Sequence, residues 1–357
     1  MEKLLSSRSI KKEPEQSWEA PALGGLCCAL AAVGLQVSVP PRNSNELSVA
    51  FGAVAVSGAL LGLLFCWLRL ASRLGLCPSL YHSTVLRPVV KDRAIRFQVA
   101  PGAYLACFAG LFSCVTVAVV SSLCQVEYAA NAAPLFLILL TPGLSCLCAY
   151  IVCKEGLQFF QVMGVVMETA GLMLAAMSIG GLWNWTSLVL GGIGLTALTV
   201  RSVLIKITQE VKFDQTSETI LELLISGGLS FGIGLYGFHR DGIEVDPTGW
   251  NLTARLIEAV AWTLAVCCMN MALYLGPTAL VLGLICLSAD LFMVHLSVEL
   301  TSSLLSGVAL TLIGAISYLC LDRILAHTAI GRTLSHPKKP TPRDSAASAV
   351  YIRLLDR

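Results

Sequence analysis

Charge is scarce in this sequence. Lys, Arg, Asp and Glu make up 13% of the 357 residues, whereas an average soluble domain carries about 25%. A chain with so little charge cannot cover a water-facing surface, which excludes a soluble globular enzyme, a disordered chain and a nucleic-acid-binding domain. The net charge of +2 argues against a strongly anionic partner. The 56% share of hydrophobic residues instead predicts a polytopic membrane protein.

Motifs for ATP-driven pumping and for metal binding are also absent from the sequence. No Gly-x-x-x-x-Gly-Lys-Ser/Thr motif occurs, which argues against an ATP-driven pump. No C-x-x-C pair lies near histidines, and most of the 14 cysteines fall inside apolar runs, where free cysteine behaves as a small hydrophobe. We therefore expect no metal, no cofactor and no enzymatic activity.

Long apolar runs are abundant. A membrane-spanning helix needs about 20 apolar residues, and ten stretches meet that length. The predicted fold is therefore all-α, with ten transmembrane helices. The predicted spans are 19–39, 46–69, 100–122, 129–152, 160–182, 187–206, 219–238, 255–275, 277–298 and 302–322.

Lysine and arginine predict the orientation of these spans, because they concentrate on the cytosolic side. All but three of the 24 (Arg42, Arg240 and Arg255) fall inside if the N-terminus is cytosolic. The N- and C-termini are thus both expected in the cytosol, as is the basic loop from Arg87 to Arg96. The sequence does not distinguish the plasma membrane from the Golgi or another endomembrane. Glycosylation triplets at Asn184 and Asn251 fall on the outer side, but chance explains them equally well.

Two segments of the sequence resemble each other. Residues 164–171 read Gly-Val-Val-Met-Glu-Thr-Ala-Gly, and residues 307–314 read Gly-Val-Ala-Leu-Thr-Leu-Ile-Gly. Each follows a glutamate, Glu155 or Glu299, by a similar distance. Five spans per half is an odd number, so the second half must enter the membrane from the opposite side. Inverted repeats of this kind occur in secondary transporters.

The repeat divides the chain into four parts. A cytosolic head and a cytosolic tail flank two five-helix repeats. The parts are 1–18 (head), 19–182 (first repeat), 187–322 (second repeat) and 323–357 (tail).

The repeated segments carry a resemblance to a known family. The stretch from Tyr128 to Gly171 has a small-residue helix, then Pro142, then Glu155, then a span that begins with glycine. It resembles an EamA repeat of the drug/metabolite transporter superfamily, which includes the nucleotide-sugar transporters of solute carrier family 35. Leu275 to Gly314 repeats the pattern, with Cys286 in place of the proline. The resemblance implies a ten-helix transporter with a central cavity.

Polar residues inside the predicted spans are the candidate solute- or proton-binding residues, because ionisable groups in a bilayer are costly and usually face a cavity or a partner. They are Asp290, Glu168, Arg201, His295, Asn131 and Asn270. A structural ion pair between Glu168 and Arg201 is the main alternative for those two residues. Glu222, Glu258 and Lys206 are expected at the membrane interface, and Asn270 is expected to bond a neighbouring helix.

These features favour a secondary-active transporter of a small organic solute by alternating access, with proton coupling through the intramembrane carboxylates. One alternative is a Golgi or ER nucleotide-sugar antiporter. However, the Gly-Ala-Leu-Asn-Lys signature of those proteins is absent, and residues 276–283 read Gly-Pro-Thr-Ala-Leu-Val-Leu-Gly. A non-transporting membrane scaffold or receptor is the alternative of another class. The expected partners are the bilayer, the solute and a proton, with a homodimer left open.

Overall fold

The computed structural model describes the chain in segments. The described residues are 44–73, 86–91, 94–125, 141–153, 159–178, 185–211, 213–241, 249–275, 278, 281 and 302–317. Eight helices and one two-stranded hairpin lie within them. The predicted span 19–39 and nearly all of the predicted span 277–298 lie outside the described residues.

The eight helices each overlap one of the predicted spans, so the all-α expectation holds for the described residues, with the hairpin as an addition. The helices are α3 (Ser44–Arg73), α4 (Pro101–Gln125), α6 (Thr141–Val152), α7 (Phe159–Ser178), α8 (Trp185–Glu210), α9 (Gln215–Asp241), α10 (Gly249–Leu275) and α12 (Ser302–Ile316). The strands are β1 (Leu86–Lys91) and β2 (Ala94–Val99).

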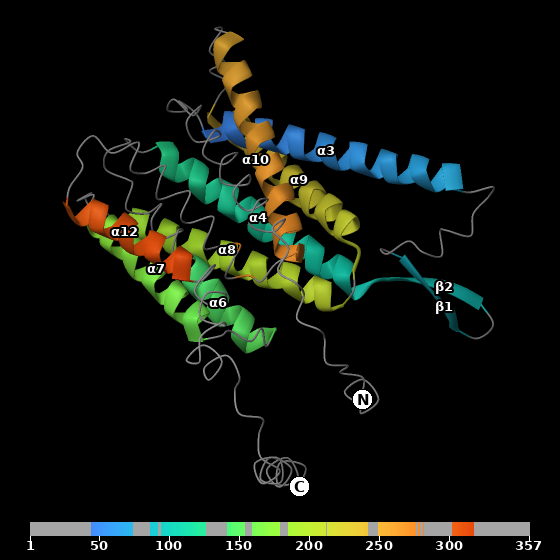
Figure 1. Ribbon diagram of the computed structural model, residues 1–357. Coiled ribbons are helices and arrows are strands. Elements are labelled where there is room, and N and C mark those ends of the chain that lie inside the picture. The colour runs from blue at the N-terminus through green and yellow to red at the C-terminus, as the bar shows by residue number, and fades with distance from the viewer. Residues whose placement is uncertain are drawn as a thin grey trace, which may run out of the picture.

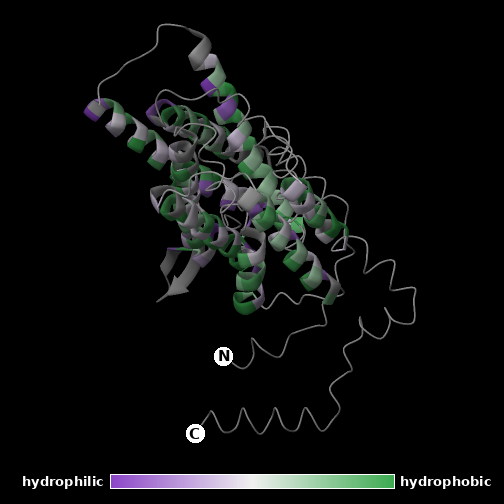
Figure 2. Ribbon diagram, turned by 90° about the vertical axis from the view of Figure 1, so that its left-hand side faces the viewer, coloured by the Kyte–Doolittle hydropathy of each residue, from purple (hydrophilic) through white to green (hydrophobic). Residues whose placement is uncertain are grey.

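Five of these helices are long and apolar enough to cross a membrane, namely α3, α4, α8, α9 and α10. Shorter apolar stretches lie in α6, α7 and α12. Figure 2 shows apolar residues over much of the described helices and few hydrophilic ones between them. The chain thus has the character of an integral multi-pass membrane protein.

The helices form a continuous bundle. Each helix contacts the next in the order α12, α7, α6, α8, α4, α9 and α3 (Figure 1). α10 lies across α3, α9 and α8. Alanines fill much of the core, such as Ala55, Ala59 and Ala259 where α3, α9 and α10 meet. Small residues let helix backbones approach closely where lipid supplies no hydrophobic driving force.

Two of the helix interfaces bring glycine against glycine. A Cβ placed on Gly52 of α3 would lie 2.6 Å from the carbonyl oxygen of Gly227 in α9, and one on Gly227 would lie 3.0 Å from that of Gly52. In the second interface, a Cβ on Gly171 of α7 would lie 2.6 Å from the carbonyl oxygen of Gly307 in α12. A Cβ on Gly307 would lie 2.7 Å from the carbonyl oxygen of Gly171. Neither interface has room for a side chain at these positions.

A short turn joins α8 to α9 and makes these two helices antiparallel. Asp214 caps α9, because its Oδ2 accepts hydrogen bonds from the Ser217 backbone N–H at 3.0 Å and from the Ser217 hydroxyl at 2.9 Å. Phe213 in the turn is buried against the alanines at the start of α4. The turn therefore fixes the α8–α9 pair at the end of the bundle where α4 begins.

The basic loop expected from Arg87 to Arg96 contains the β-hairpin. β1 pairs antiparallel with β2, from Leu86 opposite Val99 to Lys91 opposite Ala94. The hairpin extends from the end of the bundle at which α4 begins (Figure 1). The loop is thus more ordered than its composition indicates.

Candidate polar site in the helix bundle

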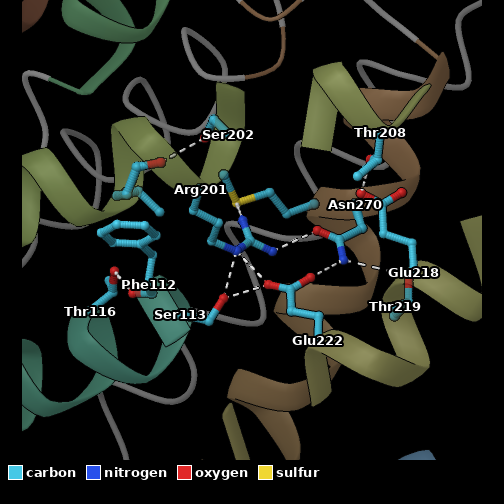
Figure 3. A network of polar contacts seen from close by, with 12 residues as sticks. Phe112, Ser113, Thr116, Arg201, Ser202, Thr208, Glu218, Thr219, Glu222 and Asn270 are labelled. Atoms are coloured by element: carbon cyan, nitrogen blue, oxygen red, sulfur yellow. Dashed lines mark hydrogen bonds and ion pairs between the residues drawn. The ribbon is translucent and has the colours of Figure 1, made fainter. Parts of the chain in front are cut away.

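Four helices meet around one buried arginine. Arg201 of α8 is 2% exposed, although its helix is apolar enough to span a membrane. Ser113 of α4, Glu222 of α9 and Asn270 of α10 surround it (Figure 3). Since these four residues come from four different helices, the site depends on the packing of the whole bundle.

Each nitrogen of the Arg201 guanidinium group contacts a neighbouring side chain. Its Nε donates to Glu222 Oε1 at 2.6 Å and to Ser113 Oγ at 2.8 Å. Its Nη2 donates to Asn270 Oδ1 at 2.6 Å, and its Nη1 contacts Met269 Sδ at 3.1 Å. A buried cation is tolerated only when it is paired and hydrogen-bonded, and Arg201 meets that condition.

Glu222 is equally enclosed, and both of its carboxylate oxygens accept hydrogen bonds. Oε1 accepts from Ser113 in addition to Arg201, and Oε2 accepts from the Asn270 amide. The Asn270 amide also contacts Thr219 Oγ1 at 3.4 Å. We call Ser113, Arg201, Glu222 and Asn270 the Arg201 network. It is a closed set of charge-assisted bonds of the kind that gives strong orientation.

A second carboxylate lies one helical turn away from Glu222. Glu218 is 1% exposed, and it accepts a hydrogen bond from the Thr208 hydroxyl of α8. Glu218 and Glu222 are four residues apart on α9 and share a helix face. The buried polar layer thus continues from the Arg201 network toward the α8–α9 turn, with one arginine and two glutamates.

The Arg201 network overturns one alternative from the sequence. Arg201 pairs with Glu222, so the ion pair considered between Arg201 and Glu168 is wrong. Glu222 and Glu258, both expected at the membrane interface, are buried among protein side chains. Glu258 forms an ion pair of 2.8 Å with Arg255, three residues before it on α10. Burial in the bundle does not give the depth of a residue in the membrane, so the interfacial placement of these two glutamates stays a prediction.

The other candidate residues are dispersed. Glu168 is buried in α7, where its backbone lies against Gly314 of α12, and it takes no part in the Arg201 network. Asp290, His295, Asn131 and Asn184 lie outside the described residues. Asn251 lies in the first turn of α10. Of the six candidate binding residues, the structure therefore brings together Arg201 and Asn270.

Ser113 and Glu218 were missed by the sequence analysis. A signal for Glu218 and Glu222 exists in the sequence, because Thr208 and Glu218 lie at similar distances on either side of the 211–214 turn, as do Arg201 and Glu222. Because the turn reverses the direction of the chain, such residues come to a similar depth, where long side chains such as those of Arg201 and Glu222 can meet. Ser113 has no comparable signal, because it reaches the network from a helix distant in sequence.

Metal binding has no support in the described residues, where no group of three or more His, Cys, Asp and Glu side chains is placed to hold an ion. The cysteines whose side chains the structure describes are free thiols, namely Cys107, Cys114, Cys146, Cys148, Cys153, Cys267 and Cys268. What the Arg201 network can do is hold a paired charge at a fixed position inside an apolar bundle.

Comparison with known proteins gives a fold but no family. No family model matches the sequence, and no curated protein matches it. Among solved structures, 26 chains match. One, described only as "Crystal structure of protein", has a TM-score of 0.57 and 15% sequence identity over 85% of this chain and 97% of its own. At this identity the likeness concerns the fold alone.

Proposed function

We propose that this protein is a secondary-active transporter of a small organic solute, built from two inverted five-helix repeats as in the drug/metabolite transporter superfamily that it resembles. The observation that carries the proposal is the buried Arg201–Glu222 pair, which lies inside an apolar bundle. Ionisable groups in such positions mark solute and ion pathways in membrane proteins.

The α7–α12 interface supports the inverted repeat. Gly164 is equivalent to Gly307 in the sequence repeat, and Gly171 to Gly314. The contacts join Gly171 to Gly307, and Gly314 to Gly164, whose carbonyl oxygen is 2.6 Å from a Cβ built on Gly314. Exchanging the two halves converts one contact into the other, as a two-fold axis requires.

The α3–α9 interface follows the same rule. A Cβ built on Gly52 would meet the backbone nitrogen of Phe231, which lies four residues after Gly227. A Cβ built on Gly227 would meet the backbone nitrogen of Val56, which lies four residues after Gly52. The packing of other helices agrees, because α4 lies against α9 as α10 lies against α3. In an inverted repeat, the second and seventh spans are equivalent, and so are the third and eighth. Here α3 and α9 correspond to the second and seventh spans, and α4 and α10 to the third and eighth, so exchanging the halves converts the α4–α9 contact into the α10–α3 contact.

The Arg201 network joins the two proposed halves. Ser113 belongs to the first half, whereas Arg201, Glu222 and Asn270 belong to the second. Alternating access moves one half against the other around a midplane site. We therefore place the solute pathway at or beside this network, where bonds between halves must change during transport.

The charge of this region favours a cationic or neutral solute. Arg201 is the only cation in the Arg201 network, and Glu222 neutralises it, while Glu218 adds a second carboxylate nearby. A diphosphate would need several uncommitted cations. A nucleotide-sugar substrate is therefore the less favoured alternative. Asp290, which lies outside the described residues, remains the proposed coupling carboxylate, and both termini are proposed to be cytosolic.

Uptake by the purified protein in liposomes tests the proposal. Radiolabelled organic cations, neutral sugars and nucleotide sugars would be screened with and without a pH gradient. We expect accumulation of a cationic or neutral solute, and its loss in Glu222→Gln, which keeps the size of the side chain but removes the charge.

Glu210→Gln, at an exposed position of α8, is the matched control and should transport normally. Absence of uptake for every class, or equal uptake by Glu222→Gln and the wild type, would contradict the proposal.

A further inference from the structure

Chain continuity ties one end of the β-hairpin to the start of a candidate membrane span. β2 ends at Val99, and the candidate span of α4 begins at Pro101. A single residue, Ala100, separates them. If α4 crosses the bilayer, the end of the hairpin formed by Leu86 and Val99 therefore lies at the level of the lipid headgroups on the side where α4 begins.

The register of the hairpin separates its residues by character. Cross-strand partners lie on the same face of an antiparallel pair, and successive residues alternate between faces. One face carries only apolar residues, and the other carries every cation of the two strands. The apolar face consists of Leu86, Pro88, Val90, Ile95, Phe97 and Val99, and the cationic face consists of Arg87, Val89, Lys91, Ala94, Arg96 and Gln98.

The hairpin has no extensive packing partner among the described helices. Val99, on the apolar face, is 42% exposed even though it lies next to α4. An isolated two-stranded hairpin is marginally stable in water unless it packs against something. The apolar face therefore needs a surface that the described part of the protein does not supply.

We propose that this surface is the anionic lipid leaflet at which α4 begins. The hairpin lies flat in the headgroup region, with its apolar face against the acyl chains and Arg87, Lys91 and Arg96 beside lipid phosphates and carboxylates. The physical basis is the one that holds amphipathic helices at a membrane surface, where apolar burial and attraction to anionic lipid act together. The hairpin thereby anchors the start of α4 independently of the solute pathway.

Photocrosslinking from neighbouring positions on opposite faces tests this placement in the full-length protein. Benzoylphenylalanine would replace either Phe97 or Gln98 in protein reconstituted into vesicles of phosphatidylcholine, alone or mixed with phosphatidylserine. We expect severalfold more lipid adducts from position 97 than from position 98, and a further increase with phosphatidylserine.

The charge contribution is tested by the triple variant Arg87→Gln, Lys91→Gln, Arg96→Gln. The matched control neutralises three cations of the C-terminal tail, Lys338→Gln, Lys339→Gln and Arg343→Gln. Only the hairpin variant should lose the phosphatidylserine effect. Equal adducts at both positions, adducts within the protein itself in place of lipid, or an unchanged lipid effect in the hairpin variant would overturn the proposal.

Discussion

The glycine-paired interfaces and the Arg201 network hold helices together by different means. α3 with α9, and α7 with α12, approach until the backbone of one helix lies against that of the other at paired glycines. Around Arg201, four helices are joined by charge-assisted hydrogen bonds between buried side chains. The first type depends on shape and the second on charge, so the two respond to different substitutions.

The two regions also differ in symmetry. Both glycine interfaces pair helices that are equivalent in the proposed repeat, and their contacts exchange under it. Glu222 has no charged counterpart in α3, because Leu47 precedes Gly52 by the same number of residues as Glu222 precedes Gly227. Leu47 is a buried apolar residue. In the proposed repeat, the position of α3 that corresponds to Glu222 is therefore apolar.

Arg201→Met should produce the largest loss of stability. It leaves Glu222 buried without its cation, and breaking a buried pair from one side costs about 3–5 kcal/mol. Unfolding in mixed detergent micelles, followed by circular dichroism, would measure the change. A loss below about 1 kcal/mol, the range of an exposed ion pair, would mean that the pair is open to water.

Gly171→Ala should have the next largest effect. The added methyl group would meet the Gly307 carbonyl oxygen and the Thr311 backbone N–H, each at 2.6 Å. Overpacking of this kind costs about 1–3 kcal/mol. Gly307→Ala should cost a similar amount if the interface is symmetric, measured by the same unfolding assay.

Gly58→Ala is the control for both glycine variants, because nothing lies within 4 Å of a Cβ at that position of α3. It should be neutral or slightly stabilising, since alanine favours helix over glycine. Equal losses in Gly58→Ala and Gly171→Ala would show that close approach is not what these glycines provide.

Ser113→Ala should cost less stability than either Arg201→Met or Gly171→Ala. It removes one hydroxyl from the Arg201 network but leaves Arg201 and Glu222 bonded to each other, so we expect a loss of about 1 kcal/mol. Ser57→Ala is the matched control, because the Ser57 hydroxyl bonds only the Ala53 carbonyl oxygen of its own exposed turn. A loss above that of Gly171→Ala would place Ser113 at the centre of the network.

Helix positions were predictable because apolar length is a local property of the chain. Each described helix overlaps a predicted span, and the glycines of 164–171 and 307–314 were visible as a repeat. The hairpin was not predicted. Its alternation is short, and the cations between Arg87 and Arg96 indicated a loop.

Pairing inside the bundle was less predictable because it depends on helix neighbours. Arg201 was recognised as a deep charge, and the only partner considered for it was Glu168, whereas the short 211–214 turn brings Glu222 to a similar depth. Position along a span gives the depth of a residue and says nothing about which helix faces it. Ser113, from a helix distant in sequence, shows this limit most clearly.

In the proposed transporter, the Arg201–Glu222 pair serves transport and not only folding. The double variant Arg201→Met, Glu222→Leu separates these roles, because replacing a buried pair by apolar residues of similar volume is often neutral or stabilising. The decisive measurement is its uptake, in liposomes, of the solute that the wild-type screen identifies, alongside its unfolding midpoint. We expect the double variant to have an unfolding midpoint closer to wild type than that of Arg201→Met, with uptake abolished. A folded double variant that transports at the wild-type rate would contradict it and make the pair purely structural.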